Sequence, residues 1–110
     1  MEQTAILDMR QMRNAAASAS GLLRVLANED RLLLLCQLSQ GECCVTDLEN
    51  RLGIQQPTLS QQLGVLRSEK VVVTRREGKH IYYRVADRRV LALLETLYGI
   101  FCKGRKDRSA

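Results

Sequence analysis

Residues 55–67 have the sequence Gln-Gln-Pro-Thr-Leu-Ser-Gln-Gln-Leu-Gly-Val-Leu-Arg, and the rest of the chain can be placed around them. Leu59, Leu63 and Leu66 are spaced as i, i+4 and i+7, which puts them on one side of a helix. Pro57 fits the first helical position, where no backbone donor is lost. This stretch therefore predicts an amphipathic helix whose leucines face the core.

The opposite face of this helix is polar but uncharged. It carries short hydroxyl and amide side chains, which can donate and accept hydrogen bonds and so suit base edges and phosphates. A surface helix that simply lacks charge is the alternative. We favour a DNA-recognition helix. Within it, Gln62 lies nearer the apolar side than Gln61 and is the less direct candidate for a DNA contact. The candidate contacts in and around it are Gln56, Thr58, Ser60, Gln61, Gln62 and Arg67.

The size and charge of the chain fit this interpretation. A length of 110 residues allows one domain, over residues 1–110, with a modest core that favours an oligomer. The net charge of +5 favours an anionic partner, with nucleic acid ahead of a membrane surface. Because only 4% of the residues are aromatic, recognition of single strands by base stacking is disfavoured. Double-stranded DNA is the expected partner.

No membrane span or signal peptide is evident, so we expect a cytoplasmic protein with no membrane partner. The chain contains four cysteines, Cys36, Cys43, Cys44 and Cys102. In a reducing compartment they are expected to be buried, metal-binding or redox-active rather than a disulfide framework.

The first part of the chain predicts two helices. Residues 1–27 show apolar positions at helical spacing, and the Ala-Ser run before Gly21 predicts a break near Ser20. Asn28 can cap a second, leucine-rich helix that is nearly all core and ends at Gly41.

A short helix is predicted over residues 47–52. Thr46 and Glu49 match a capping box, in which each side chain satisfies a backbone donor of the first turn. Gly53 is expected to end the helix in a left-handed conformation. This helix, the tight turn and the polar helix after it form a helix-turn-helix pattern.

Two β-branched or alternating runs follow. Residues 71–76 and 81–85, separated by Glu77-Gly78-Lys79, predict a β-hairpin. A basic hairpin after a recognition helix is a wing, and its charges would contact phosphates or a minor groove. A solvated hairpin with charged ends is the alternative. The candidate DNA contacts of the wing are Arg75, Arg76, Lys79 and His80.

The last helix is apolar around most of its circumference from Val90 to Phe101, more than one small domain can cover. We therefore expect it to form a homodimer interface, followed by a frayed polar tail over residues 103–110. The predicted fold class is mainly α with a β-hairpin (α+β), in the element order of a winged helix-turn-helix.

This order resembles the ArsR family of dimeric bacterial repressors. Residues 26–32, Leu-Ala-Asn-Glu-Asp-Arg-Leu, are similar to the Leu-Ala-x-x-x-Arg-Leu segment of that family, and residues 59–67 to its Ser-x-x-Leu-x-x-Leu recognition helix. The resemblance covers roughly residues 20–102. It implies a repressor that binds operator DNA. An enzyme or a cofactor is not expected, because the chain has a single His, no Gly-rich phosphate loop and no Cys-x-x-Cys motif.

The metal sites of that family are incomplete in this chain. Its metalloid sensors carry Cys-Val-Cys before Asp-Leu, whereas residues 44–48 are Cys-Val-Thr-Asp-Leu and lack the second thiolate. Its zinc-type site needs Asp and His on the closing helix, where Asp87 stands alone. No metal site is therefore expected.

Cys36 and Cys102 lie in contexts similar to those of the BigR/SqrR-like, sulfide- and persulfide-responsive subgroup. That resemblance implies a polysulfide bridge between the two thiols of one protomer, formed by reactive sulfur species such as organic persulfides, which releases the repressor from DNA. Two alternatives stay open. Cys36 could be a buried small hydrophobe, and Cys43 and Cys44 could bind arsenite or another thiophilic metal.

Overall fold

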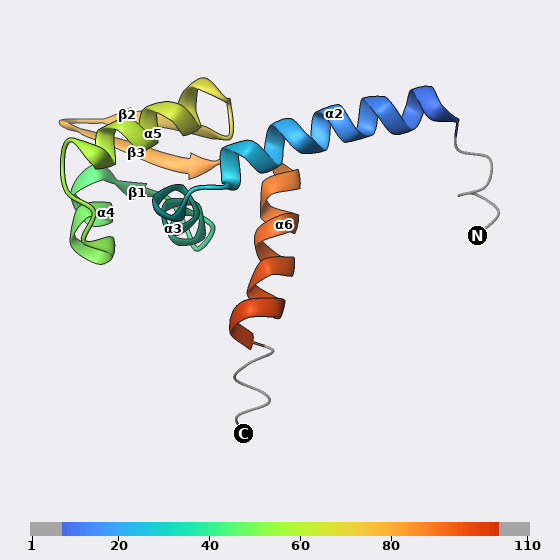
Figure 1. Cartoon of the computed structure of the whole chain (residues 1–110). Coiled ribbons are helices and arrows are strands. Elements are labelled where there is room, and N and C mark those ends of the chain that lie inside the picture. The colour runs from blue at the N-terminus through green and yellow to red at the C-terminus, as the bar shows by residue number, and fades with distance from the viewer. Residues whose placement is uncertain (1–7, 104–110) are drawn as a thin grey trace.

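The computed structural model describes residues 8–103, which form a mainly helical domain with a small sheet (Figure 1). The predicted helical residues 1–7 and the predicted tail beyond residue 103 lie outside this range. No helix among the described residues is long and apolar enough to cross a membrane. The elements in chain order are α2 (Met9–Leu26), α3 (Glu29–Leu38), β1 (Cys43–Cys44), α4 (Val45–Leu52), α5 (Thr58–Ser68), β2 (Val72–Glu77), β3 (His80–Val85), α6 (Arg88–Tyr98) and the π-helical turn η1 (Gly99–Lys103).

Helix α2 is uninterrupted, so the predicted break near Ser20 is wrong. Alanine is the best helix former and supplies much of the middle of α2, which offsets the cost of the neighbouring glycine. Asp8 caps the helix by accepting a hydrogen bond from the Gln11 N–H at 2.8 Å. Within α2 only Val25 and Leu26 are buried, and Figure 1 shows the helix projecting from the body of the molecule.

Helix α3 begins as predicted, since the Asn28 side chain accepts a hydrogen bond from the Arg31 N–H at 3.0 Å. Leu34 and Leu35 are fully buried. The helix is not core on all sides, however, because Cys36 is exposed. The alternative that Cys36 is a buried small hydrophobe is therefore wrong for this chain.

A third strand, β1, was missed by the sequence analysis. It pairs antiparallel with β3, with Cys43 opposite Tyr83 and Cys44 opposite Tyr82, and the sheet order is β1-β3-β2. Both cysteines are buried. Pairing with β3 holds the chain extended up to Cys44, which occupies the cap position of α4. The predicted capping box at Thr46 is therefore wrong, and α4 has no side-chain cap.

The helix-turn-helix itself is confirmed. Gly53 adopts the predicted left-handed conformation at φ 72°, and its N–H donates to the Glu49 carbonyl at 2.9 Å. Pro57 lies one position earlier than predicted, at the cap before α5. The three leucines of α5 that were predicted to face inward, Leu59, Leu63 and Leu66, are all buried.

The predicted hairpin is confirmed as β2 and β3, which pair from Val72 opposite Val85 to Glu77 opposite His80. Gly78 supplies the positive φ of 64° in its turn. One core joins the helix-turn-helix, the sheet and the start of α6. Its members include Leu34, Leu35, Leu48, Leu59, Leu63, Leu66, Val71, Val72, Val90 and Leu94.

Candidate nucleic-acid interface and thiol pair

The outer face of α5 is a polar, solvent-exposed surface. Thr58, Ser60, Gln61 and Arg67 are exposed on it, as the helical spacing predicts. A side chain added at Gly64 would meet nothing, so this part of the helix is open to close approach. These groups can form hydrogen bonds to base edges and to phosphates without rearranging the core.

Two candidate contacts are paired with each other. The Gln56 Oε1 accepts hydrogen bonds from the Ser60 hydroxyl and from the Ser60 N–H, the latter at 3.3 Å. The amide thus satisfies one of the backbone donors left open at the N-terminus of α5. Gln56 orders the first turn of the helix as well as lying beside the recognition surface.

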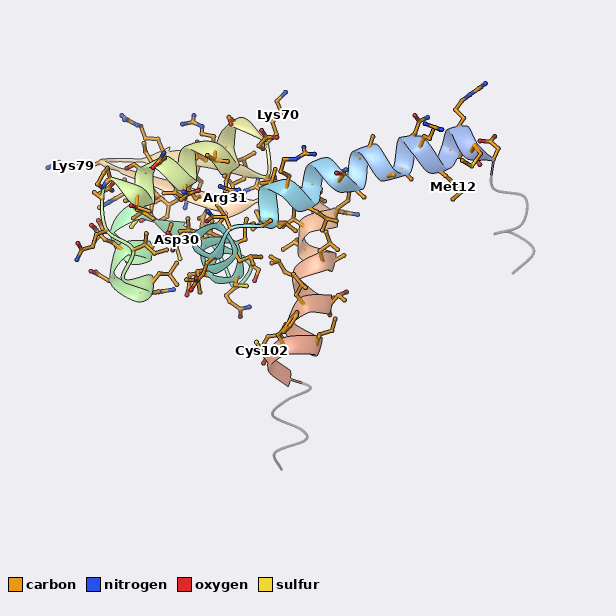
Figure 2. All side chains as sticks on the ribbon, in the orientation of Figure 1. Met12, Asp30, Arg31, Lys70, Lys79 and Cys102 are labelled. Carbon is orange, nitrogen blue, oxygen red and sulfur yellow. The ribbon has the colours of Figure 1, made fainter. Side chains whose placement is uncertain are left out.

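Gln62 has a structural partner that the sequence did not reveal. Its Oε1 accepts a hydrogen bond from Arg31 Nη1 at 2.9 Å. The same guanidinium donates to the carbonyls of Val25 and Arg24, at 2.6 and 3.2 Å. Arg31, which is half-buried, therefore links α2, α3 and α5, and Figure 2 shows it where these helices meet. Gln62 is half-buried and holds α5 in place in addition to any contact with DNA.

The wing presents Arg76, Lys79 and His80 to solvent. Within the described range, Arg76 and Lys79 take part in no ion pair. Lys79 lies at the tip of the hairpin, far from α2 and α6 (Figure 2). These cations are free to meet phosphates.

Arg75, also predicted as a DNA contact, is engaged within the protein. Its guanidinium pairs with Glu42 at 2.6 Å and with Glu77 at 2.7 Å. It also lies over the Tyr82 ring, 4.8 Å from the centroid. The hydrogen bonds that Arg75 donates hold the pKa of the Glu42 carboxyl below its usual value, and donating to both carboxylates raises the pKa of the guanidinium.

The thiols divide into two pairs. Cys43 and Cys44 are buried, whereas Cys36 and Cys102 are exposed. Cys36 lies on α3, and Cys102 lies in η1 beyond the end of α6 (Figure 2). Partial burial, and then the negative charge of the Cys102 thiolate, raise the pKa of the Cys36 thiol. The charge of Cys102 thus contributes to the raised pKa of a cysteine that lies far from it in sequence.

An open groove of about 630 Å³ lies between α3 and α6 beside Cys36. Cys36, Ser39 and Gln40 line it from α3 and the turn after it, and α6 contributes Leu91, Leu94, Glu95 and Tyr98. The groove leaves Cys36 accessible to a small solute.

Among the described residues, no group of three or more His, Cys, Asp or Glu side chains is arranged to hold a metal ion. Asp87, considered for a zinc-type site, instead caps α6. It accepts a hydrogen bond from the Arg89 N–H at 2.9 Å and pairs with the Arg89 guanidinium at 2.7 Å. These interactions lower the pKa of Asp87.

Comparison with known proteins places these features in context. Residues 28–72 match the model of a family described as bacterial regulatory protein, arsR family. The chain is 53% identical to the biofilm growth-associated repressor of Agrobacterium fabrum over 83% of this chain and 78% of that protein. The crystal structure of the transcriptional repressor BigR from Xylella fastidiosa superposes with a TM-score of 0.81 at 45% identity, over 87% of this chain and 98% of that one. Reduced HlyU from Vibrio cholerae N16961 has a TM-score of 0.81 at 37% identity, over 86% and 99% of the two chains.

Proposed function

The chain belongs to the arsR family of bacterial regulatory proteins, and on that premise we propose that it is a transcriptional repressor with a dithiol switch. In the reduced state it binds operator DNA as a homodimer. It leaves the operator when Cys36 and Cys102 of one protomer are bridged by sulfur from a persulfide or polysulfide.

DNA binding is supported by the exposed polar face of α5 and by the free cations of the wing. Gln61 and Ser60 supply hydrogen-bonding groups for base edges, and Lys79 supplies a cation for a phosphate. The membership in a helix-turn-helix family agrees with this assignment.

The observation that carries the switch is that two of the four thiols are exposed, one on α3 and one in η1. Cys36 and Cys102 come from α3 and η1 and influence each other electrostatically, while Cys43 and Cys44 are buried. A thiol that reacts with a solute needs exposure, and a second thiol nearby resolves the adduct. Cys36 and Cys102 are both exposed, and the influence of Cys102 on the pKa of Cys36 supports the second requirement.

The chemistry balances with a persulfide as the only oxidant. Each cysteine thiolate attacks the outer sulfur of a persulfide RSSH, so that the S–S bond breaks, RS⁻ leaves and the cysteine becomes a persulfide. The Cys36 persulfide then attacks the Cys102 Sγ and expels HS⁻, which leaves a trisulfide bridge. Two thiols and two RSSH thus give one trisulfide, two RSH and one hydrogen sulfide. The two cysteines are oxidised, and one sulfane sulfur is reduced to sulfide.

Such a bridge would join α3 to the end of α6. In a dimer of helix-turn-helix domains the two recognition helices must fit half-sites about 34–36 Å apart. Tying α3, which packs in the core beneath α5, to the dimerisation helix would change this separation without blocking the DNA surface.

Serine substitutions test the proposal directly. We expect Cys36→Ser and Cys102→Ser each to bind DNA in the reduced state and to stay bound after treatment with glutathione persulfide, whereas Cys43→Ser with Cys44→Ser should respond like the wild type. Fluorescence anisotropy of a labelled duplex measures both states. The arsenite hypothesis predicts the opposite result: the Cys43/Cys44 variant, treated with arsenite, would be the one that no longer leaves DNA.

A further inference from the structure

A charged cluster on the outer face of the sheet connects the wing to the segment that follows α3. The Arg75 Nε donates to both carboxylate oxygens of Glu42 at 3.0 Å, and Nη2 donates to Glu42 Oε1 at 2.6 Å. Nη1 donates to Glu77 at 2.7 Å. Each guanidinium nitrogen therefore has a carboxylate partner, and a phosphate could be bound through Arg75 only in competition with these bonds. Bidentate geometry of this kind fixes orientation as well as distance.

The two acids differ in where they lie. Glu77 is on β2, the same strand as Arg75, so this bond stays within the wing. Glu42 lies in the short connection between α3 and β1. The Glu42–Arg75 pair therefore spans two parts of the fold that are 33 residues apart in sequence.

Glu42 is also close to the thiol site along the chain. The helix that carries Cys36 ends at Leu38, and a short turn leads directly to Glu42 and then to β1. β1 in turn pairs with β3 of the wing. The C-terminal end of α3 is thus attached to the wing twice, through the β1–β3 backbone pairing and through the Glu42–Arg75 ion pair.

We propose that Arg75 is a wing-positioning residue rather than a phosphate contact, and that the Glu42–Arg75 pair transmits the state of the Cys36–Cys102 site to the wing. This rests on the proposed function. A displacement of α3 on sulfur bridging would move Glu42, and the wing would follow through the guanidinium.

The proposal predicts that removing the charge of Glu42 changes the affinity for DNA in the direction opposite to the one expected from charge alone. Replacing Glu42 by Gln removes a negative charge near the DNA surface, which by charge alone strengthens binding to a polyanion and releases Arg75 for phosphate. If the pair positions the wing, Glu42→Gln instead weakens binding. The matched control is Glu77→Gln, because it removes the same charge from the same guanidinium but leaves the connection to α3 intact.

The experiment measures the affinity of the reduced full-length protein for a duplex selected from a random library, over a series of salt concentrations. Glu42→Gln and Arg75→Gln are each expected to weaken binding by about 2- to 30-fold, the range for substitutions in a coupled network. The variant that carries both substitutions should bind at least as tightly as the single variant with the lower affinity, because the two residues act as one pair. The slope of log affinity against log salt concentration (the salt slope) should be unchanged in Arg75→Gln. Loss of a phosphate contact would instead lower the magnitude of this slope by about one.

The same samples are then treated with glutathione persulfide. For each variant, the affinity of the reduced protein for DNA is divided by that of the sulfur-bridged protein. This ratio should be smaller for Glu42→Gln than for the wild type, and it should be unchanged for Glu77→Gln. Either of two results overturns the proposal. One is that reduced Glu42→Gln binds DNA as tightly as the wild type or more tightly, and the other is that Arg75→Gln has a salt slope lowered by about one. A wild-type protein that persulfide does not release contradicts the proposed function instead, and the reduced-state affinities still decide whether Arg75 positions the wing.

Discussion

Gln61 presents an exposed amide on the outer face of α5, and we expect it to recognise a base edge. Gln61→Ala should lower the preference for the operator over variant sequences by about 1–3 kcal/mol at the contacted position. Competition binding with single base-pair variants measures this preference. Lys79→Ala is the control, since loss of a phosphate contact should weaken all sequences alike. Equal losses on every sequence for both variants would show that readout lies elsewhere.

The Cys36 thiol offers a test through its ionisation. Because its pKa is raised, its thiolate is scarcer at neutral pH than in an ordinary cysteine and increases as the pH rises. Cys102→Ser removes a neighbouring negative charge, so the pKa of Cys36 should fall and its alkylation by iodoacetamide should reach half-maximal rate at lower pH. Mass spectrometry of the Cys36 peptide over a pH series gives the profile. A profile that does not move would mean that the two thiols do not interact.

For single residues, the sequence predicts which side chains are exposed better than it predicts which side chains bond to each other. The helical spacing of α5 identifies Gln61 and Ser60 as outward-facing, and both are exposed. It cannot show that Arg31 bonds to Gln62 or that Arg75 pairs with Glu42, because these partners are brought together only by the tertiary fold. The signal for Arg31 was its place in the family motif.

Among the elements, α6 depends on the cap supplied by Asp87. Asp87→Ala should lower the free energy of unfolding by about 1 kcal/mol, whereas Asp87→Asn should retain most of the cap. The Asp87 pKa is lowered in the folded protein, so its ionised form stabilises the fold at pH values above the ordinary aspartate pKa of 3.8. This contribution is lost as the pH falls through the lowered pKa. Urea titrations between pH 2.5 and 7 should show a smaller acid-induced loss for Asp87→Asn than for the wild type, and equal losses would refute the role of the charge.

The elements that the sequence predicts well have a clear period or a local signal. The leucine spacing of α5, the left-handed Gly53 and the Asn28 cap each depend on residues within about two helical turns of one another, and all three are present. Strand β1 has only two residues and therefore no period, and its partner β3 lies far along the chain. Because the pairing with β3 sets the start of α4, the predicted capping box failed for the same reason.

Large apolar side chains are exposed along α2, α6 and η1, and Figure 1 shows that α2 and α6 project from the body of the molecule. A small domain rarely leaves so many large apolar groups in water unless a partner covers them, and we therefore expect a homodimer through this surface. The exposed members are Met9, Met12 and Leu23 on α2 and Leu91, Tyr98, Ile100 and Phe101 on α6 and η1.

Met12→Glu should convert the dimer to a monomer, because a charge buried at an apolar interface without a partner is costly. Operator affinity should then fall by roughly a hundredfold or more, since two half-sites are no longer bound together. Analytical ultracentrifugation measures the oligomeric state. Gln11→Glu on the same helix introduces the same charge at a polar position and should leave the dimer intact. A dimeric Met12→Glu protein would place the interface elsewhere.

The proposed switch depends on the chemistry of Cys36 and Cys102 and on its effect on DNA binding. The most direct measurement is peptide mass spectrometry of the reduced protein after exposure to glutathione persulfide, with operator affinity determined on the same sample and with hydrogen peroxide, arsenite and zinc in parallel. Our account predicts a Cys36–Cys102 crosslink that contains extra sulfur, together with loss of DNA binding. The opposite result is that Cys36 and Cys102 remain unmodified while arsenite binds at Cys43 and Cys44 and releases the protein from DNA. That result would contradict the proposed switch.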